Sequence, residues 1–254
     1  MVGADGVLVV DTRGSHRQAD ELRDHLRELG AAPVRWVVNT HGHFDHCFGN
    51  ARFRPPLADA DLWGHEAIVP YLAANAETAR QAMIDANPAH ADELTQVVVT
   101  PPDHLVGDVA SLDLGDRVVR LHHVGRGHTD NDLVLVVPDA GVVFAGDLVE
   151  ESAPPAYGDD AFPLEWPATA LRVVDLVGDS DTVVPGHGDV VDKAFADEQR
   201  AGLVDVAQLV RELHDAGVPV DRAVDEGAGR WPWPPAALTH AVRRGYAQLD
   251  GELV

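Results

Sequence analysis

Four side chains of the kind that bind metal ions lie within six consecutive positions, directly after a predicted strand. The strand is expected over 33–39 and leads into the segment THGHFDH. In an extended chain residues i and i+2 project to the same side, so His41 and His43 can share one ion, while a turn after them lets Asp45 and His46 face a second. Because burying such ionisable groups without partners is costly, the segment favours a fold that presents a metal-binding loop at a strand end.

Three further donors follow at wide spacing, each at the end of a predicted strand or in a loop marked by glycine. His128 lies in GRGHTD, Asp147 in VVFAGDLV and His187 in VVPGHGD. Strand ends can present side chains to one common edge, so residues far apart in the sequence can converge on one site. With the first segment they make five His and two Asp, enough for two metal ions with one bridging carboxylate. Imidazole and carboxylate are typical ligands of zinc, and iron or manganese accept the same set.

The hydrophobic pattern predicts a chain of mixed strands and helices. Short apolar runs predict strands over 7–10, 33–39, 96–100, 109–114, 117–122, 133–137, 142–145 and 182–184. Amphipathic spacing predicts helices over 15–29, 167–177, 192–216 and 235–249, a mostly helical segment over 55–94, and a loop over 218–235. Since no repeat or low-complexity linker interrupts the pattern, we predict one layered α/β domain over 1–254, with a core of about 1–190 and a helical C-terminal extension of about 191–254.

Composition and charge exclude several classes of partner. The 254 residues include 42 acidic and 19 basic side chains, a formal net charge of −23. Attraction to phosphate requires a basic face, so neither nucleic acid nor an anionic membrane is an expected partner. No apolar stretch reaches the roughly 20 residues of a membrane span, and the first residues lack the basic region of a signal peptide. We therefore expect a cytoplasmic protein with a small-molecule substrate, while its oligomeric state stays open.

Some residues beside the candidate donors admit more than one interpretation. Cys47 adjoins the first donor segment, and we expect it to be a small buried residue rather than a nucleophile or a ligand, because free cysteine is commonly a core residue. Thr129, Asp130 and Asp132 are either partners of the neighbouring imidazole or ordinary turn-capping residues. Candidates for the wall of a substrate pocket, or for a surface loop, follow Asp147: they are Glu150, Glu151, Tyr157, Phe162 and Trp166.

The order of these motifs resembles that of the metallo-β-lactamase-fold hydrolases. Asp11, then HGHFDH, then the three separated donors stand in the order of that family's five motifs, and THGHFDHCFGN is similar to the form seen in glyoxalase II-like members. The match covers about 7–187. The resemblance implies a four-layer αββα sandwich of two mixed β-sheets, with the metals at one edge of the sheets. The family usually has one or two strands before the strand that ends at Asp11, so either the start is truncated or the first sheet has a ragged edge.

The resemblance also assigns a role to each donor. The first ion would be held by His41, His43 and His128, the second by Asp45, His46 and His187, and the bridging carboxylate would be Asp147. Asp11 would orient the imidazoles of the HGHFDH loop, as metal-binding histidines require. The cofactor implied is zinc, two ions per chain, with iron or manganese as substitutes.

The function implied is that of a binuclear zinc hydrolase. A metal-bridging hydroxide would attack a small ester, thioester or lactone, with Asp45 as the catalytic side chain beside it. Asp rather than Cys at position 147 disfavours an antibiotic-degrading role. The chain also lacks the nearby Tyr of acyl-homoserine-lactone lactonases and the C-terminal Arg-x-x-Lys of true glyoxalase II, while His rather than Glu at position 43 argues against the flavodiiron branch. Two alternatives stay open: a mononuclear iron oxygenase like the persulfide dioxygenases, and a non-catalytic metal-binding member of the fold.

Overall fold

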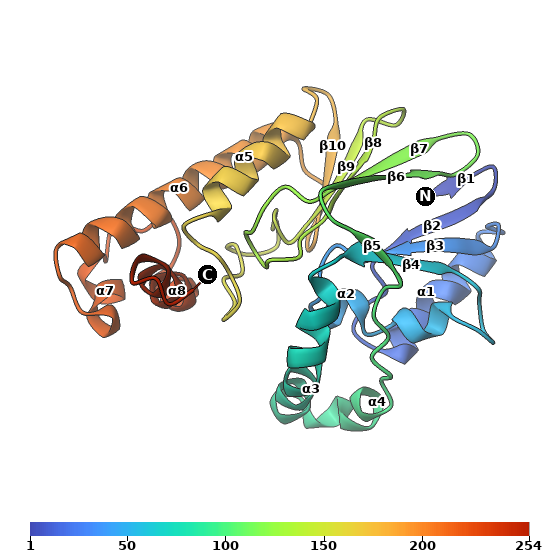
Figure 1. Cartoon of the computed structure of the whole chain (residues 1–254), viewed down its shortest axis with the longest axis horizontal. Helices are drawn as coiled ribbons and strands as arrows, with labels where there is room; N and C mark the ends of the chain where they lie inside the picture. The colour runs from blue at the N-terminus through green and yellow to red at the C-terminus, as the bar shows by residue number, and fades with distance from the viewer. Residues whose placement is uncertain (254) are drawn as a thin grey trace. The chain divides into compact units, whose positions relative to one another are not determined.

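The computed structural model of the chain describes residues 1–253 (Figure 1). They divide into two compact units, Met1–His123 and the residues from Val124 onward, which we call unit 1 and unit 2 and describe separately. The single domain with a boundary near 190 stays a prediction. No helix in the described part of the chain is both long and apolar enough to span a membrane.

Unit 1 contains a five-stranded mixed sheet in the order β1-β2-β3-β4-β5. Its strands are β1 (Val2–Gly3), β2 (Gly6–Val10), β3 (Val34–Val38), β4 (Asp61–His65) and β5 (His104–Val106). β1 pairs antiparallel with β2, and the other neighbours are parallel. Parallel strands are covered on both faces, which explains why β2 appears in the sequence as a continuous apolar run. Val10 pairs with Val38 at the carboxyl ends of β2 and β3, so the segments that follow these two strands start side by side.

The helices of unit 1 are α1 (His16–Glu28), α2 (Phe44–Cys47), α3 (Ile68–Ala86) and α4 (Ala91–Thr95), with short 3-10 turns at Asn50–Phe53 and Pro88–His90. Ser15 caps α1 by accepting a hydrogen bond from the backbone of Gln18, and serine is a preferred residue at this position. The apolar face of α1 packs on Val7, Val9 and Val37 of the sheet. Unit 1 ends with an antiparallel hairpin of β6 (Val109–Asp113) and β7 (Val118–His122).

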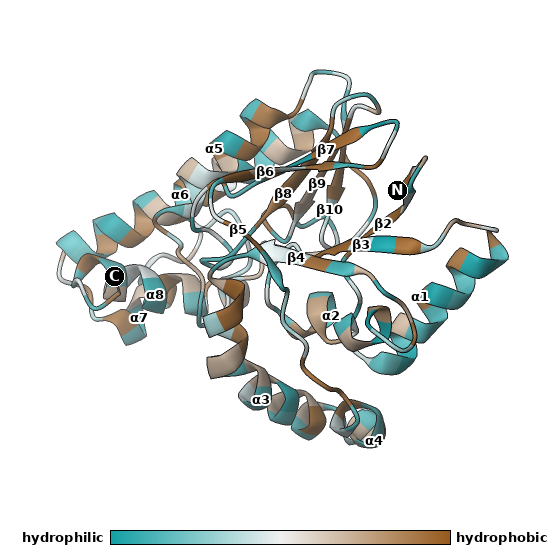
Figure 2. Ribbon diagram, turned by 45° about the vertical axis from the view of Figure 1, so that its right-hand side comes forward, coloured by the Kyte–Doolittle hydropathy of each residue, from teal (hydrophilic) through white to brown (hydrophobic). Residues whose placement is uncertain are grey.

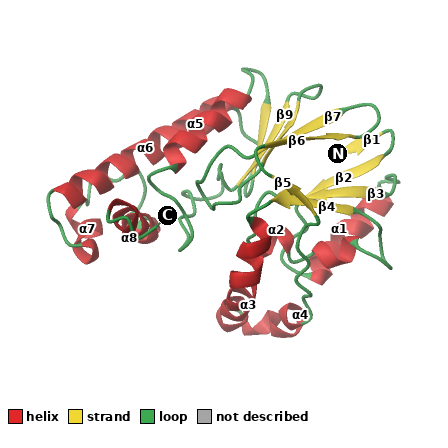
Figure 3. Ribbon diagram, in the orientation of Figure 1, coloured by secondary structure: helices red, strands yellow, loops and turns green. Residues whose placement is uncertain are grey.

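Unit 2 contains the strands β8 (Val134–Val137), β9 (Val142–Gly146) and β10 (Thr182–Pro185). β9 is antiparallel to β8 and parallel to β10, so unit 2 also has mixed pairing. These strands are mainly hydrophobic (Figure 2). The helices are α5 (Trp166–Leu176), α6 (Lys193–Asp215), α7 (Val220–Glu226) and α8 (Thr239–Leu249), visible in red in Figure 3. Residues of the strands and of all four helices share one hydrophobic core.

The structure corrects several predictions of local structure. The segment predicted as mostly helical, 55–94, contains β4, which the sequence pattern missed because Asp61, Gly64 and His65 interrupt its apolar run. The segment 96–100 is not a strand; two prolines follow it directly, and proline cannot donate to a ladder. The predicted loop over 218–235 contains α7, whose N-cap is Pro219. The predicted helix 235–249 begins as a 3-10 turn and becomes α-helical only at Thr239.

The other predicted elements agree with the structure to within a few residues. β1 precedes β2 and is only two residues long. β5 was not predicted, because three residues with one buried side chain leave almost no periodic signal.

Candidate metal centre

The loop after β3 brings together the four donors of unit 1. The ring centroids of His41 and His43 lie 4.6 Å apart, and those of His41 and His46 lie 4.2 Å apart. Nε2 of His46 is 3.4 Å from Oδ2 of Asp45. His41 and His46 are buried, while His43 and Asp45 are partly exposed. The turn after His43 is the first turn of α2, which begins at Phe44.

Asp11, at the end of β2, holds this loop from the neighbouring strand. Its Oδ1 accepts a hydrogen bond from the Thr40 backbone at 2.7 Å, and its Oδ2 accepts one from the Thr40 hydroxyl at 2.8 Å. Nδ1 of His46 lies 2.8 Å from the same Oδ2. Because a carboxylate only accepts, this contact places the proton of His46 on Nδ1 and the ring lone pair on Nε2, the form that binds a metal.

A buried amide network that was not predicted from the sequence supports the same loop. Asn39 donates to the carbonyl of His46 at 3.0 Å, and Asn50 donates to the Asn39 side chain at 2.7 Å. The Thr12 hydroxyl donates to Asn50 at 2.8 Å. All three side chains are fully buried. The only signal in the sequence was the Asn that closes THGHFDHCFGN.

Cys47 is buried, as predicted, with 2% of its surface exposed. Its Sγ lies 3.1 Å from the carbonyl oxygen of His43, to which it can donate. Burial raises the pKa of the thiol far above its ordinary value. The side chain is therefore a neutral thiol on the inner side of the loop, which is the wrong form for a nucleophile or a metal ligand.

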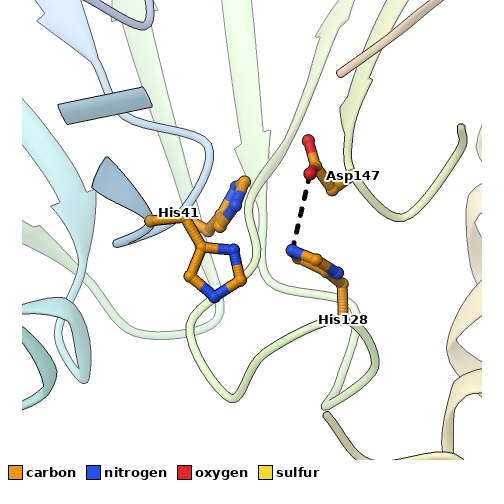
Figure 4. A group of neighbouring side chains, drawn as sticks. His41, His128 and Asp147 are labelled. Atoms are coloured by element: carbon orange, nitrogen blue, oxygen red, sulfur yellow. Dashed lines mark ion pairs between the residues drawn. The ribbon is translucent and has the colours of Figure 1, made fainter. Parts of the chain in front are cut away.

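In unit 2 two histidines that are far apart in the sequence lie beside the Asp147 carboxylate. Oδ2 of Asp147 lies 3.5 Å from Nε2 of His128 and 3.4 Å from Nε2 of His187, and the first of these contacts is drawn in Figure 4. Nδ1 of His128 lies 2.9 Å from the carbonyl oxygen of Ala156, an acceptor, so that nitrogen carries the proton. Nε2 of His128, the nitrogen nearer Asp147, is then the one with the lone pair.

The parallel pairing of β9 and β10 explains why Asp147 and His187 meet. Gly146 pairs with Pro185 at the carboxyl ends of these strands, and the donors follow within two residues. The backbone of Gly186 donates to the carbonyls of Gly146 and Val149. A Cβ at position 186 would lie 1.9 Å from Oδ1 of Asp147, so only glycine leaves room for the carboxylate.

Two of the residues with alternative interpretations form a local turn. The backbone and hydroxyl of Thr129 both donate to the Asp132 carboxylate, at 2.8 and 2.9 Å. This is turn capping of the kind predicted as one alternative. Trp166, a candidate wall residue, is instead fully buried in the core, and its ring lies 5.6 Å from that of His128.

Glu150, predicted only as a candidate wall residue, lies where it could help to hold a metal ion. Its carboxylate is buried, with 5% of the residue exposed. One donor atom each of Asp147, Glu150 and His187 lie within 4.8 Å of one another. The signal in the sequence was its place, three residues after the donor at the end of β9.

The chemistry of these donors fits a divalent cation. Each unit offers imidazoles whose protons are directed onto protein acceptors, together with carboxylates beside them. Such sets suit zinc, iron or manganese.

Comparison with known proteins gives matches over most of the chain. The family model described as the metallo-beta-lactamase superfamily matches residues 1–187. A metallo-beta-lactamase type 2 of Bacillus cereus is 25% identical over 192 residues, which are 75% of this chain and 66% of that protein. The corresponding protein of Bacillus sp. (strain 170) is 24% identical over 75% of this chain and 65% of its own length. The chain thus spans slightly less than two thirds of the length of these curated relatives.

Solved structures give the same result for the fold. A metallo-beta-lactamase from Pontibacter korlensis superposes with a TM-score of 0.66 at 20% identity, covering 81% of this chain and 85% of that one. The crystal structure of VMB-1 gives 0.63 at 21% identity, covering 82% and 84%. At these identities the similarity shows the fold alone. The predicted fold class, α/β with mixed sheets and a helical C-terminal region, is confirmed.

Proposed function

Because the chain belongs to the metallo-beta-lactamase superfamily, we propose that it is a metal-dependent hydrolase that binds two divalent ions, with zinc as the first choice. The observation that carries the proposal is that both units present prearranged imidazole and carboxylate donors at strand ends. We assign the donors as the family resemblance suggests: the first ion to His41, His43 and His128, the second to Asp45, His46 and His187, and the bridge to Asp147.

The proposed substrate is a small ester, thioester or lactone. When bound, the metal ions would lower the pKa of a water molecule to about 7 and polarise the substrate carbonyl. Asp45 would accept a hydrogen bond from that water and orient it toward the carbonyl carbon. Asp11 would keep the proton of His46 on Nδ1, and the carbonyl of Ala156 would do the same for His128. No covalent intermediate is proposed, since the Cys47 thiol is buried and neutral.

A small substrate is part of the proposal because the net charge of −23 opposes polyanions. We also retain the cytoplasm as the proposed location. The curated relatives are named as metallo-beta-lactamases, so a β-lactam belongs among the substrates to be tested, although Asp at position 147 argues against it.

Metal content and hydrolysis test this function together. Elemental analysis of the purified protein should find about two zinc ions per chain, and a chromogenic panel of esters, thioesters, lactones and a β-lactam should identify the substrate class. Hydrolysis should be lost in Asp45→Ala and retained in Asp92→Ala, an exposed aspartate of the same unit. One iron with oxygen uptake would replace the hydrolase with an oxygenase, and a protein without metal would be a non-catalytic member of the fold.

A further inference from the structure

We propose that Glu150 is an additional metal ligand, which with Asp147 and His187 makes a carboxylate-rich position suited to a divalent cation such as Mn²⁺. The inference rests on the proposed function, because it concerns one of the two ions proposed there. All three residues belong to unit 2, and one donor atom of each lies within 4.8 Å of the other two. The family resemblance gave Glu150 no such role.

Charge balance is the first argument for a cation at this position. Asp147 and Glu150 are both buried, with 5% of each residue exposed. Two buried carboxylates this close repel each other, and burying each of them is costly unless a positive charge compensates. Glu150 forms no ion pair with Arg or Lys among residues 1–253. A divalent ion held beside Glu150 would supply a compensating positive charge.

The second argument is that Glu150 is oriented by its own hydrogen bonds. The backbone and hydroxyl of Ser152 donate to Oε1 of Glu150 at 3.1 and 2.6 Å. Within the described part of the chain nothing donates to its other oxygen, Oε2. A carboxylate anchored through one oxygen in this way is a common arrangement for a metal ligand, since the surrounding hydrogen bonds fix its direction.

The backbone around Glu150 is also fixed by hydrogen bonds. Gln199, a buried residue of α6, accepts a hydrogen bond from the Glu150 backbone and donates one to the carbonyl of Leu148, both at 2.9 Å. Glu150 also lines a cavity of about 430 Å³ with Glu198 and Trp233. The backbone at Glu150 is therefore fixed in place by α6, and the residue is preorganised.

The donor types indicate which ion this position prefers. Two carboxylates and one imidazole form an oxygen-rich set, and such sets suit Mn²⁺ better than the histidine-rich sets that zinc favours. Glu150 should therefore matter more for Mn²⁺ than for Zn²⁺.

The test is a metal titration of the full-length protein after removal of metal by a chelator. Isothermal titration with Mn²⁺ and with Zn²⁺ should show one Mn²⁺ position weakened about 10–100-fold in Glu150→Gln, with a smaller loss for Zn²⁺. Glu198→Gln is the matched control, because it removes the same charge from the wall of the same cavity. It should bind both metals as the unsubstituted protein does.

A second variant distinguishes the loss of a metal ligand from a folding defect. Ser152→Ala keeps the carboxylate and removes only the hydroxyl that orients it, so Mn²⁺ affinity should fall about fivefold, as expected for one lost hydrogen bond. The Mn²⁺ electron paramagnetic resonance spectrum should change in both Glu150→Gln and Ser152→Ala. Unchanged affinity and spectrum in the two variants would overturn the role of Glu150 while leaving the hydrolase proposal intact. A protein that binds no divalent ion at all would overturn both proposals.

Discussion

The two units supply metal-type donors in different ways. In unit 1 the four candidate donors come from one segment of six residues. They lie close together because the chain makes one turn there, at the start of α2. In unit 2 the candidate donors His128, Asp147 and His187 lie 19 and 40 positions apart along the chain. Asp147 and His187 meet because β9 and β10 pair in parallel. A local cluster depends on the conformation of a few residues, whereas a dispersed cluster depends on the register of a sheet.

The two sets of donors are also held by different means. Side chains hold the loop of unit 1: Asp11 binds Thr40 and His46, and a buried amide network binds the loop backbone. In unit 2 a glycine does this: Gly186 has no side chain and so leaves space for the Asp147 carboxylate. Its backbone also donates hydrogen bonds to the carbonyls of Gly146 and Val149 at the end of β9. The first set should therefore be sensitive to loss of polar groups, and the second to gain of volume.

The largest expected effect tests whether both sets serve one reaction. His41→Ala in unit 1 and His128→Ala in unit 2 should each lower kcat/KM by about 10³-fold. The double variant should be no worse than either single variant, because residues that act as a unit give non-additive losses. Steady-state kinetics on the substrate found in the panel measures this, and losses that multiply in the double variant would mean that the two sets act independently.

A glycine substitution tests the volume argument for unit 2. Gly186→Ala would place a methyl group on the Asp147 carboxylate, so we expect about a 10²-fold loss of activity and about 1–3 kcal/mol of lost stability from overpacking. Metal stoichiometry and urea unfolding measure the two effects. Gly107→Ala, where the added Cβ meets nothing closer than 3.9 Å, should change neither, and an active Gly186→Ala protein would contradict the packing argument.

The matching test for unit 1 is Asp11→Asn. The backbone of Asp11 has φ +60°, and Asn tolerates that conformation, so the substitution removes the charge with little strain. We expect metal affinity to fall about 10–100-fold, because the partner that orients His46 is weakened. Competition with a chromogenic chelator measures the affinity. An unchanged value would show that the loop is fixed by the amide network alone.

The smallest expected effect concerns Cys47. Since burial raises the pKa of its thiol, a thiol reagent should not label it in the folded protein even at a pH where an exposed thiol is ionised, and should label it in urea. Cys47→Ala should cost about 1 kcal/mol of stability through a small cavity and leave kcat/KM unchanged. Rapid labelling of the folded protein, or a large loss of activity, would mean that the thiol faces the reaction.

Much of the fold was predictable because strands and helices with regular apolar spacing leave a local signal. β2, β3 and β6 to β10 agree with the predicted runs, as do α1, α5 and α6. β4 and β5 were not predicted, since Gly64 and flanking polar residues obscure the first and the second is only three residues long. The strand predicted over 96–100 was wrong because apolar spacing there has another cause. Val97 and Val99 pack in a hydrophobic cluster with residues of α3 and do not pair in a sheet.

The candidate site, too, was predictable only in part. The sequence by itself indicated the family and singled out the seven candidate donors, because HGHFDH is a local pattern and the later motifs keep their order along the chain. Only the tertiary structure showed that the Asp11 carboxylate contacts Thr40 and His46. The same holds for the space that Gly186 leaves for Asp147 and for the position of Glu150 near Asp147 and His187. The physical reason is that these contacts depend on the register of Val10 with Val38 and of Gly146 with Pro185. Hydrogen bonding between distant strands sets that register, and no short segment of sequence encodes it.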